Sequence, residues 1–173
     1  MAHLRLGSKP LQWLLVGLLL GLMWLGWAAP VGAATHTYHE RPGQTTYRSQ
    51  QSLRDRTDRA WQATLFKRYV GGNLQGIYLR LVGFPGVIQV AAQQSLQINT
   101  GTGLVWQAEP SLDPQTQNLP DNVGQYDLQS VLADLKGAIP LELVVPLRRG
   151  EAHLTVAPFV VEEWRSLNQV ADP

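Results

Sequence analysis

The clearest structural signal in this chain is the stretch AWQATLFKRYVGGNLQGIYLRLVGF, residues 60–84. In its first part Trp61, Ala63 and Leu65 occupy every second position, so they share one face of an extended strand, with Phe66 on the opposite face. The Gly-Gly-Asn in the middle supplies the positive backbone angles that a tight reversal needs. The sequence therefore predicts an antiparallel β-hairpin here.

The return strand, residues 76–84, has one apolar face and one mixed face. Its apolar face carries Ile77, Leu79 and Leu81, and its mixed face carries Tyr78, Arg80 and Val82. We expect only the apolar face to be buried, as in antiparallel sheets that have one solvated side. Pro85 and Gly86 then end the strand.

Further short strands flank this hairpin. The expected strands are TTYRSQQSL (45–53), VIQVAA (87–92), SLQIN (95–99), LVWQA (104–108), LELVVPL (141–147) and AHLTVAP (152–158). The last two form a second hairpin around Arg148-Arg149-Gly150, and Pro146 places that hairpin at a sheet edge because proline cannot donate a ladder hydrogen bond. Strands at short, regular spacing favour an antiparallel meander or a sandwich-like sheet.

Two segments have helical rather than β periodicity. Residues 128–136 place apolar side chains at helical spacing, with Asp127 as the expected N-cap and Gly137 behind. Residues 159–167 fit a short helix after Pro158 or a last strand, and we favour the helix. Residues 109–125, with three prolines, are expected to be a surface loop. The predicted class is α+β, mainly antiparallel β with one or two short helices.

Residues 1–34 have the three-part layout of a secretory signal peptide. A basic start precedes the uncharged run WLLVGLLLGLMWLGW (13–27), and small residues follow Pro30. Cleavage after Ala33 or Ala34 fits, and we favour Ala34; the alternative is an uncleaved anchor, which needs roughly 20 apolar residues. We then expect a flexible arm at residues 35–43, one β-rich domain at 44–173, and no membrane span after cleavage.

Charge and cysteine content exclude several classes of protein. Cleavage removes Arg5 and Lys9, which takes the basic residues from 14 to 12 against 13 acidic residues, and this near-neutrality argues against a dedicated nucleic-acid binder. Cysteine is absent, so a thiol nucleophile, a disulfide framework and a Cys-ligated metal are excluded. Residues 40–80 hold eight basic and three acidic residues. Either this charge interleaves with the acidic remainder of the chain, or it forms a basic face for an acidic partner or an anionic lipid surface.

The densest charge lies in the loop at residues 54–59. Its charged members, the candidate recognition residues, are Arg54, Asp55, Arg56, Asp58 and Arg59. Alternating signs can form local ion pairs that only close a turn, yet exposed pairs are worth roughly 0 to 1 kcal/mol. Guanidinium groups also bind carboxylates and phosphates through planar, paired donors. The loop therefore has both a structural and a recognition interpretation.

No catalytic set is predicted. His153 lies in an expected strand, where a structural imidazole is favoured over a general base. Asp55 and Asp58 neighbour three arginines, which would keep both carboxylates ionised, whereas an acid-base pair needs one of them protonated. His36 and His39 are weak metal candidates on an arm that offers no rigid scaffold. We expect no cofactor and no metal.

The tryptophans of the mature chain have a packing interpretation and a ligand interpretation. Trp61, Trp106 and Trp164 each fall inside an expected element, where aromatic side chains dominate small cores. Alternatively, Trp61, Tyr78 and Trp106 line a pocket for an apolar ligand.

Four tracts resemble a cyanobacterial family of small exported proteins, the domain of unknown function 3122. They are residues 41–68, 76–86 (GIYLRLVGFPG), 123–132 (VGQYDLQSVL) and 160–164 (VVEEW). The resemblance implies a photosynthetic host, and hence a thylakoid lumen or periplasm, but it implies no catalytic residue.

Our expectation is an exported accessory or binding protein that acts without chemistry, with a protein partner at or near a membrane, such as a photosynthetic complex. The alternatives are a carrier of small apolar ligands and, less favoured, a hydrolase built around His153.

Overall fold

The computed structural model of the chain describes residues 36–41, 43–111 and 119–170. Its strands are β1 (His36–Arg41), β2 (Gln44–Arg54), β3 (Ala60–Val70), β4 (Asn73–Val82), β5 (Leu96–Thr100), β6 (Val105–Ala108), β7 (Val123–Asp127), β8 (Leu141–Pro146) and β9 (Glu151–Val156). Its helices are α2 (Gln129–Asp134) and α3 (Pro158–Gln169). The predicted signal peptide lies outside the described residues.

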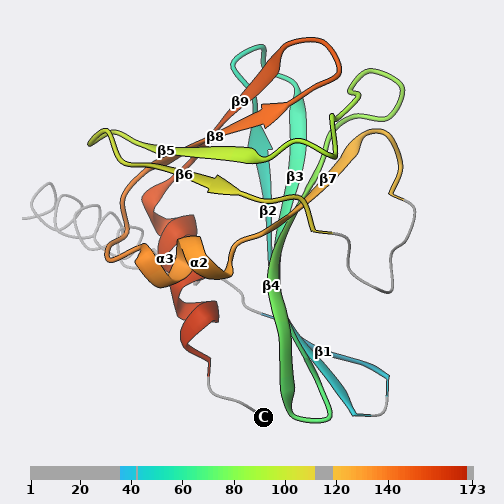
Figure 1. Cartoon of the computed structure of the whole chain (residues 1–173), viewed down its shortest axis with the longest axis vertical. Helices are drawn as coiled ribbons and strands as arrows, with labels where there is room; N and C mark the ends of the chain where they lie inside the picture. Colours follow the sequence, from blue (N-terminus) through green and yellow to red (C-terminus); the bar gives the residue numbers. More distant parts are fainter. Residues whose placement is uncertain (1–35, 42, 112–118, 171–173) are drawn as a thin grey trace, which may run out of the picture. The chain divides into compact units, whose positions relative to one another are not determined.

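The strands form two antiparallel sheets (Figure 1). Sheet A has the order β1-β2-β3-β4-β7, and sheet B has the order β6-β5-β8-β9. The expected fold class, a mainly antiparallel α+β fold, is confirmed.

The hairpin predicted at residues 60–84 is formed by β3 and β4. Leu65 pairs with Leu79 on one face and Phe66 pairs with Tyr78 on the other. Gly71 and Gly72 have φ angles of 56° and 78°, the positive values that the turn requires. β4 begins at Asn73, earlier than predicted, because pairing continues up to the turn.

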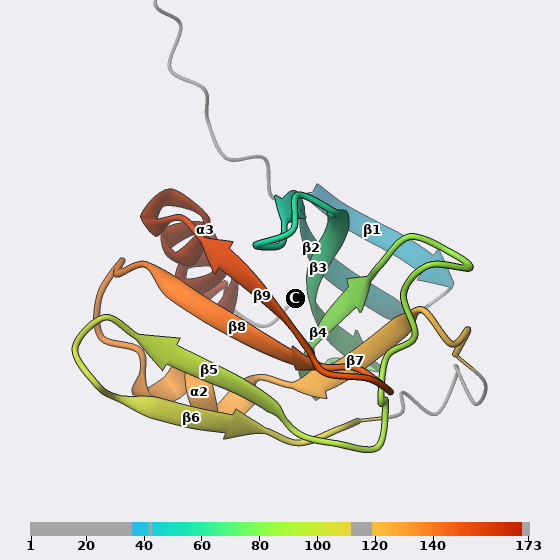
Figure 2. The same cartoon turned by 90° about the horizontal axis from the view of Figure 1, so that it is seen from above.

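The core lies between the inner face of sheet A and a cover made by sheet B and the helices (Figures 1 and 2). α3 packs against β2 and β3, α2 contacts β4, and β9 lies beside β2. The largest fully buried side chains include members of both sheets and of α3, among them Leu65, Leu79, Leu81, Tyr126, Ile98, Leu143 and Trp164. Core positions are confirmed for Trp61 and Trp164, whereas Trp106 is half-buried and packs against the core.

Both predicted helices are present. α3 begins at Pro158, whose missing N–H is harmless in the first turn, and its apolar side buries Val161, Trp164 and Leu167. At its other end Lys67 Nζ donates to the carbonyl oxygens of Asn168 and Val170, at 3.0 and 2.8 Å. Within residues 36–41, 43–111 and 119–170, no helix is long and apolar enough to cross a membrane.

α2 is shorter than the predicted segment 128–136. Its N-cap position is Leu128, and Asp127 instead accepts a hydrogen bond from the N–H of Gln129 at 2.8 Å. The helix ends at Asp134, before Gly137, because Leu135 adopts an extended conformation and packs into the core.

One strand falls inside the segment predicted as a loop. β7 pairs with β4 and ends sheet A, so the prediction of a loop over 109–125 is wrong for its last residues. The sequence does not reveal this strand, because Gly124 occupies a position that faces the core, where an apolar side chain would be expected. There a Cβ would lie 2.6 Å from the hydroxyl oxygen of Tyr126, so the ring of Tyr126 covers the glycine.

A strand was predicted at residues 87–92, and this prediction is wrong because these residues form no strand. Val90 makes an isolated bridge to Leu147, and its N–H donates to the carbonyl of Asp121. The β8–β9 hairpin lies at an edge of sheet B, as predicted, with β9 as the outer strand, although Pro146 itself is on the inner strand β8, between β5 and β9. β5 pairs with β8 only as far as Val144, so the missing N–H of Pro146 breaks no ladder bond with β5.

The N-terminal arm also differs from expectation. Residues 36–41, predicted to be flexible, form β1 and pair with β2, with His36 opposite Arg48 and Tyr38 opposite Thr46. The pairing is irregular between Tyr38 and Arg41. A short polar edge strand of this kind carries no apolar alternation that could reveal it.

Candidate functional site

The loop between β2 and β3 is organised by the carboxylate of Asp55. Asp55 Oδ1 accepts hydrogen bonds from the N–H and hydroxyl of Thr57, at 2.9 and 2.7 Å, and from the N–H of Arg59 at 3.0 Å. Asp55 Oδ2 accepts from Arg59 Nε at 2.8 Å and from Trp61 Nε1 at 3.2 Å. The side chain is only 1% exposed. Asp55 therefore closes the loop from inside, and it is not at the surface as a recognition residue would be.

These contacts also fix the charge of Asp55. Burial alone would raise the pKa of this carboxyl. The hydrogen bonds from Thr57, Arg59 and Trp61 outweigh burial and hold the pKa of Asp55 well below its ordinary value. The buried charge is compensated by Arg59, whose side chain remains 36% exposed.

Arg54 and Asp58 form a second, external pair. Arg54 Nη1 donates to the backbone oxygen of Asp58 at 2.8 Å and to its Oδ1 at 3.2 Å. Asp58 has a positive φ of 64°, which among the described residues no other non-glycine residue adopts. This conformation turns the chain back toward Arg54. Both side chains stay in solvent, 65% and 84% exposed. The pair orients the guanidinium group without covering it.

Arg56 leaves the loop and contacts sheet B. Its guanidinium donates to Glu142 Oε1 on β8, and its N–H donates to the carbonyl of His153 on β9 at 3.2 Å. His153 Nδ1 lies 3.2 Å from the same Glu142 oxygen. The structure therefore brings together Arg56 and His153, for which the sequence predicted separate roles. Glu142, which joins them, was not singled out from the sequence.

Glu142 is the centre of a polar cluster on the outer face of sheet B. Asn99 Nδ2 lies 3.5 Å from Glu142 Oε2, and Gln97 donates to Asn99 at 2.8 Å. Burial alone would raise the pKa of Glu142, but Asn99, Arg56 and His153 together lower it. No isolated residue signals this cluster, because its members come from four separate segments of the chain.

His153 is neither exposed nor isolated. Its side chain is 28% exposed, and Nε2 lies 3.8 Å from Glu151 Oε2. Among the residues that the structure describes, no group of three or more His, Cys, Asp or Glu is arranged to hold a metal ion. The weak metal candidates His36 and His39 belong to β1, and their side chains lie outside the described part of the chain.

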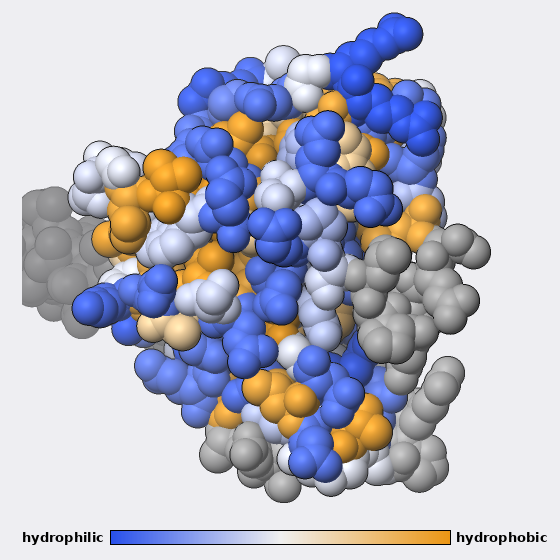
Figure 3. Space-filling model, in the orientation of Figure 1, coloured by the Kyte–Doolittle hydropathy of each residue, from blue (hydrophilic) through white to orange (hydrophobic). Residues whose placement is uncertain are grey.

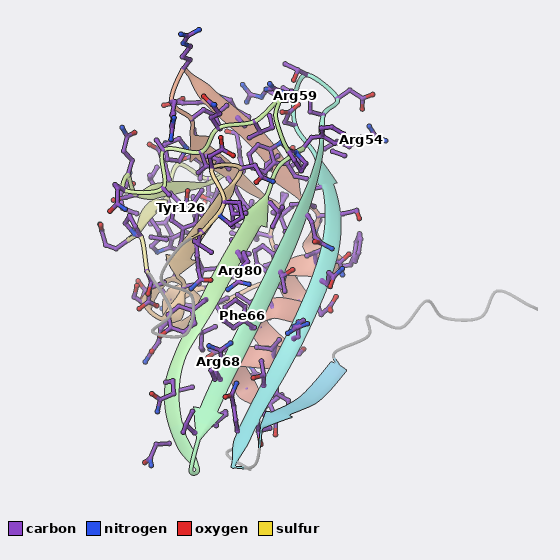
Figure 4. All side chains as sticks on the ribbon, turned by 90° about the vertical axis from the view of Figure 1, so that its right-hand side faces the viewer. Arg54, Arg59, Phe66, Arg68, Arg80 and Tyr126 are labelled. Carbon is purple, nitrogen blue, oxygen red and sulfur yellow. The ribbon has the colours of Figure 1, made fainter. Side chains whose placement is uncertain are left out.

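A second arginine arrangement lies on the outer face of sheet A. The guanidinium carbons of Arg68 and Arg80 lie 5.2 and 5.3 Å from the ring centre of Phe66 (Figure 4). Arg80 also donates through Nε and Nη2 to Gln125 Oε1, at 2.9 and 2.7 Å. Phe66 and Arg68 are only 4% and 8% exposed, so this stack ties β3, β4 and β7 together.

The model of the family described as "Protein of unknown function (DUF3122)" matches residues 33–167. The chain belongs to the DUF3122 family. Searches among curated proteins and among solved structures found no match to it. The resemblance on the four sequence tracts is thereby confirmed, and the family description names no activity.

The pocket proposed for Trp61, Tyr78 and Trp106 is not assembled in this DUF3122 domain. Trp61 and Tyr78 lie on opposite faces of sheet A, since Trp61 shares the face of Leu65 while Tyr78 pairs with Phe66. Trp106 lies on β6 of sheet B, opposite Ile98. Two surface hollows formed by described residues, one around Ala91 and Arg148 and one around Gln107 and Ser130, include none of the three.

The β2–β3 loop of the DUF3122 domain thus carries three arginines that differ in their contacts and in their exposure to solvent. Arg59 is committed to the buried Asp55, whereas Arg54 and Arg56 are 65% and 66% exposed. Each exposed guanidinium is held by one carboxylate and keeps further N–H donors in solvent. The arrangement is suited to accept carboxylate or backbone oxygens from another molecule.

Proposed function

We propose that the domain is a non-catalytic binding protein that is exported to the periplasm or thylakoid lumen and recognises a protein partner at or near the membrane, such as a photosynthetic complex. The recognition surface is the β2–β3 loop with the adjoining Glu142 cluster. The compartment rests on the signal-peptide layout of residues 1–34 and on the host implied by the sequence resemblance.

The observation that carries this proposal is the state of Arg54 and Arg56. Both guanidinium groups are about two-thirds exposed, yet each is already oriented by a contact inside the domain. Orienting a long side chain before association reduces the entropy lost on binding. Arginine is also among the residues that contribute most to protein interfaces. The partner surface should offer carboxylates or carbonyl oxygens to these two groups.

The proposal is tested by capture of partners from host membranes. The processed protein, which is the chain after the expected cleavage at Ala34, is prepared as wild type and with Arg54→Ala and Arg56→Ala. The proteins that each form captures are identified by mass spectrometry. Arg59 is left unchanged because it neutralises Asp55. Lys136→Ala, an exposed cation after α2, is the control. We expect the double variant to lose a membrane protein that wild type and control retain; equal recovery by all three would refute the proposal.

No described contact favours a second function. The carrier alternative lacks its pocket, because Trp61 and Tyr78 lie on opposite faces of sheet A. A hydrolase would use His153, which is held between Glu142 and Glu151 on the outer face of sheet B and does not line either hollow.

A further inference from the structure

We infer that a second surface at the same end of the domain binds an anionic lipid bilayer. It consists of the apolar turn Phe84–Val87 and the basic turn Arg148–Gly150, and we call it the apolar-basic tip. The inference is independent of the protein partner proposed above, because a lipid surface contains no protein. Both surfaces would face the same membrane.

The apolar turn exposes large side chains from a rigid base. Phe84 and Val87 are 62% and 60% exposed. The turn is closed by hydrogen bonds from the N–H groups of Val87 and Ile88 to the Phe84 carbonyl, at 3.3 and 3.0 Å. Ile88 is buried and occupies the space beside Gly83, where a Cβ would lie 2.6 Å from it. The exposed side chains are therefore presented by a fixed turn.

The basic turn carries the arginines that the fold does not use. Every other arginine among residues 43–111 and 119–170 has a side-chain hydrogen bond, ion pair, ring contact or electrostatic interaction within the domain. Among residues 43–111 and 119–170, Arg148 and Arg149 have no such side-chain partner, and both are exposed. Their turn is closed by the bond from the N–H of Leu147 to the carbonyl of Gly150 at 3.1 Å.

Backbone contacts join the basic turn to the residues that directly follow the apolar turn. The N–H of Arg148 donates to the carbonyl of Gln89 at 2.9 Å, and Val90 forms a bridge with Leu147. Figures 1 and 2 place the segment after β4 next to the β8–β9 turn. At this end of the domain, apolar and hydrophilic surface adjoin each other in Figure 3.

This combination fits an anionic bilayer. Apolar side chains on a turn can enter the boundary between headgroups and acyl chains, while arginines beside them contact lipid phosphates. Two carboxylates lie nearby: Glu151 Oε2 is 3.8 Å from His153 Nε2, and Asp121 Oδ2 is 3.5 Å from the Gln89 amide nitrogen, a neutral group that leaves this carboxylate charged. The attraction to lipid phosphates therefore rests on the exposure of Arg148 and Arg149, and not on a net positive charge of the tip.

The inference is tested by sedimentation of the processed protein with vesicles of phosphatidylcholine alone or with about 30% phosphatidylglycerol. The variants are Arg148→Gln with Arg149→Gln, and Phe84→Ser with Val87→Ser. Lys136→Gln and Phe159→Ser, a cation and an exposed aromatic elsewhere on the surface, are the controls. All proteins carry the same N-terminus, so that segment cannot produce a difference between them.

We expect wild type and both controls to bind the anionic vesicles and to bind neutral vesicles weakly. Loss of both arginines should weaken binding to anionic vesicles about 25-fold, from about fivefold for each arginine near the surface. The apolar variant should weaken binding to both vesicle types. Equal binding by all variants, or none by wild type, would overturn the inference. Capture of a membrane protein through the tip, with no binding to vesicles, would also overturn the inference, because the tip would then bind a protein and not a lipid surface.

Discussion

Asp55 joins the loop, the core and the surface of this domain. Its carboxylate is almost fully buried and accepts bonds from Thr57, Arg59 and Trp61. Asp55 also makes an isolated bridge to Leu154 of β9, so the same residue links sheet A to sheet B. A single side chain thus binds Arg59 and closes the loop that carries Arg54 and Arg56.

We predict that Asp55→Asn destabilises the domain by about 2–4 kcal/mol, because an amide nitrogen would face the donors of Arg59 and Trp61 and the buried guanidinium contact would lose its counter-charge. Urea unfolding of the processed protein measures this change. Asp58→Asn, at an exposed carboxylate, is the control and should change the free energy by less than about 0.5 kcal/mol.

The effect of Asp55 should depend on pH. Its pKa is lowered in the folded state, so its stabilising contribution is complete above the unfolded-state pKa of about 3.9 and declines as pH falls toward the folded-state value. The stability difference between wild type and Asp55→Asn should therefore be constant from pH 7 to pH 5 and shrink below pH 4. A difference that grows on acidification would contradict the assignment.

For single residues, the sequence indicated which side chains form ion pairs better than it indicated their partners. The alternating charges of residues 54–59 indicated ion pairs, and two are present within the loop. Neither the burial of Asp55 nor the contact of Arg56 with Glu142, 86 residues away, has a local signal. Such contacts follow from how the sheets meet, which a linear pattern does not contain.

Among the elements, β7 depends on the close approach of Tyr126 to Gly124. We predict that Gly124→Ala costs about 1–3 kcal/mol, because the added methyl would lie 2.6 Å from the Tyr126 hydroxyl oxygen, and that ring is fully buried and cannot swing away freely. Thermal unfolding measures the loss. Gly137→Ala has no atom within 4 Å of its new Cβ and is the matched control; equal losses would show that the contact is unimportant.

The end of α3 depends on Lys67 of β3. We predict that Lys67→Met costs about 1–2 kcal/mol, because the carbonyls of Asn168 and Val170 lose their donor and the helix dipole loses a cation at its C-terminus. Hydrogen exchange should show faster opening of the last turn of α3. Lys136→Met, at an exposed lysine, should leave that turn unchanged, and unchanged exchange in the Lys67 variant would remove the capping role.

Elements with strong periodicity were the ones that sequence could predict. The β3–β4 and β8–β9 hairpins combine clear alternation with Gly in their turns, and for α3 the preceding Pro158 favoured a helix over a strand. β7 was missed because a glycine and a buried glutamine interrupt its apolar pattern. Residues 87–92 were over-predicted because their hydrogen bonds go to separate partners instead of one strand.

At the scale of the whole molecule, sheets A and B meet at the end that carries the β2–β3 loop, the β8–β9 turn and the segment after β4 (Figure 1). The candidate recognition residues and the apolar-basic tip therefore lie at the same end of the domain, although they come from three separate parts of the chain. Strand spacing predicted antiparallel strands in a meander or a sandwich-like sheet, but not their division into these two sheets. The mutual packing of the sheets, and hence this shared end, was not predicted either.

We have proposed that the β2–β3 loop is the surface that meets a protein partner. Hydrogen exchange of the processed protein, with and without detergent-solubilised host membranes, tests it most directly. We predict slower exchange in residues 54–59 and in β9 near His153, whose carbonyl accepts from Arg56. The Arg54→Ala, Arg56→Ala variant should lose this protection. Protection confined to other surfaces, or protection that survives in the variant, would contradict the account.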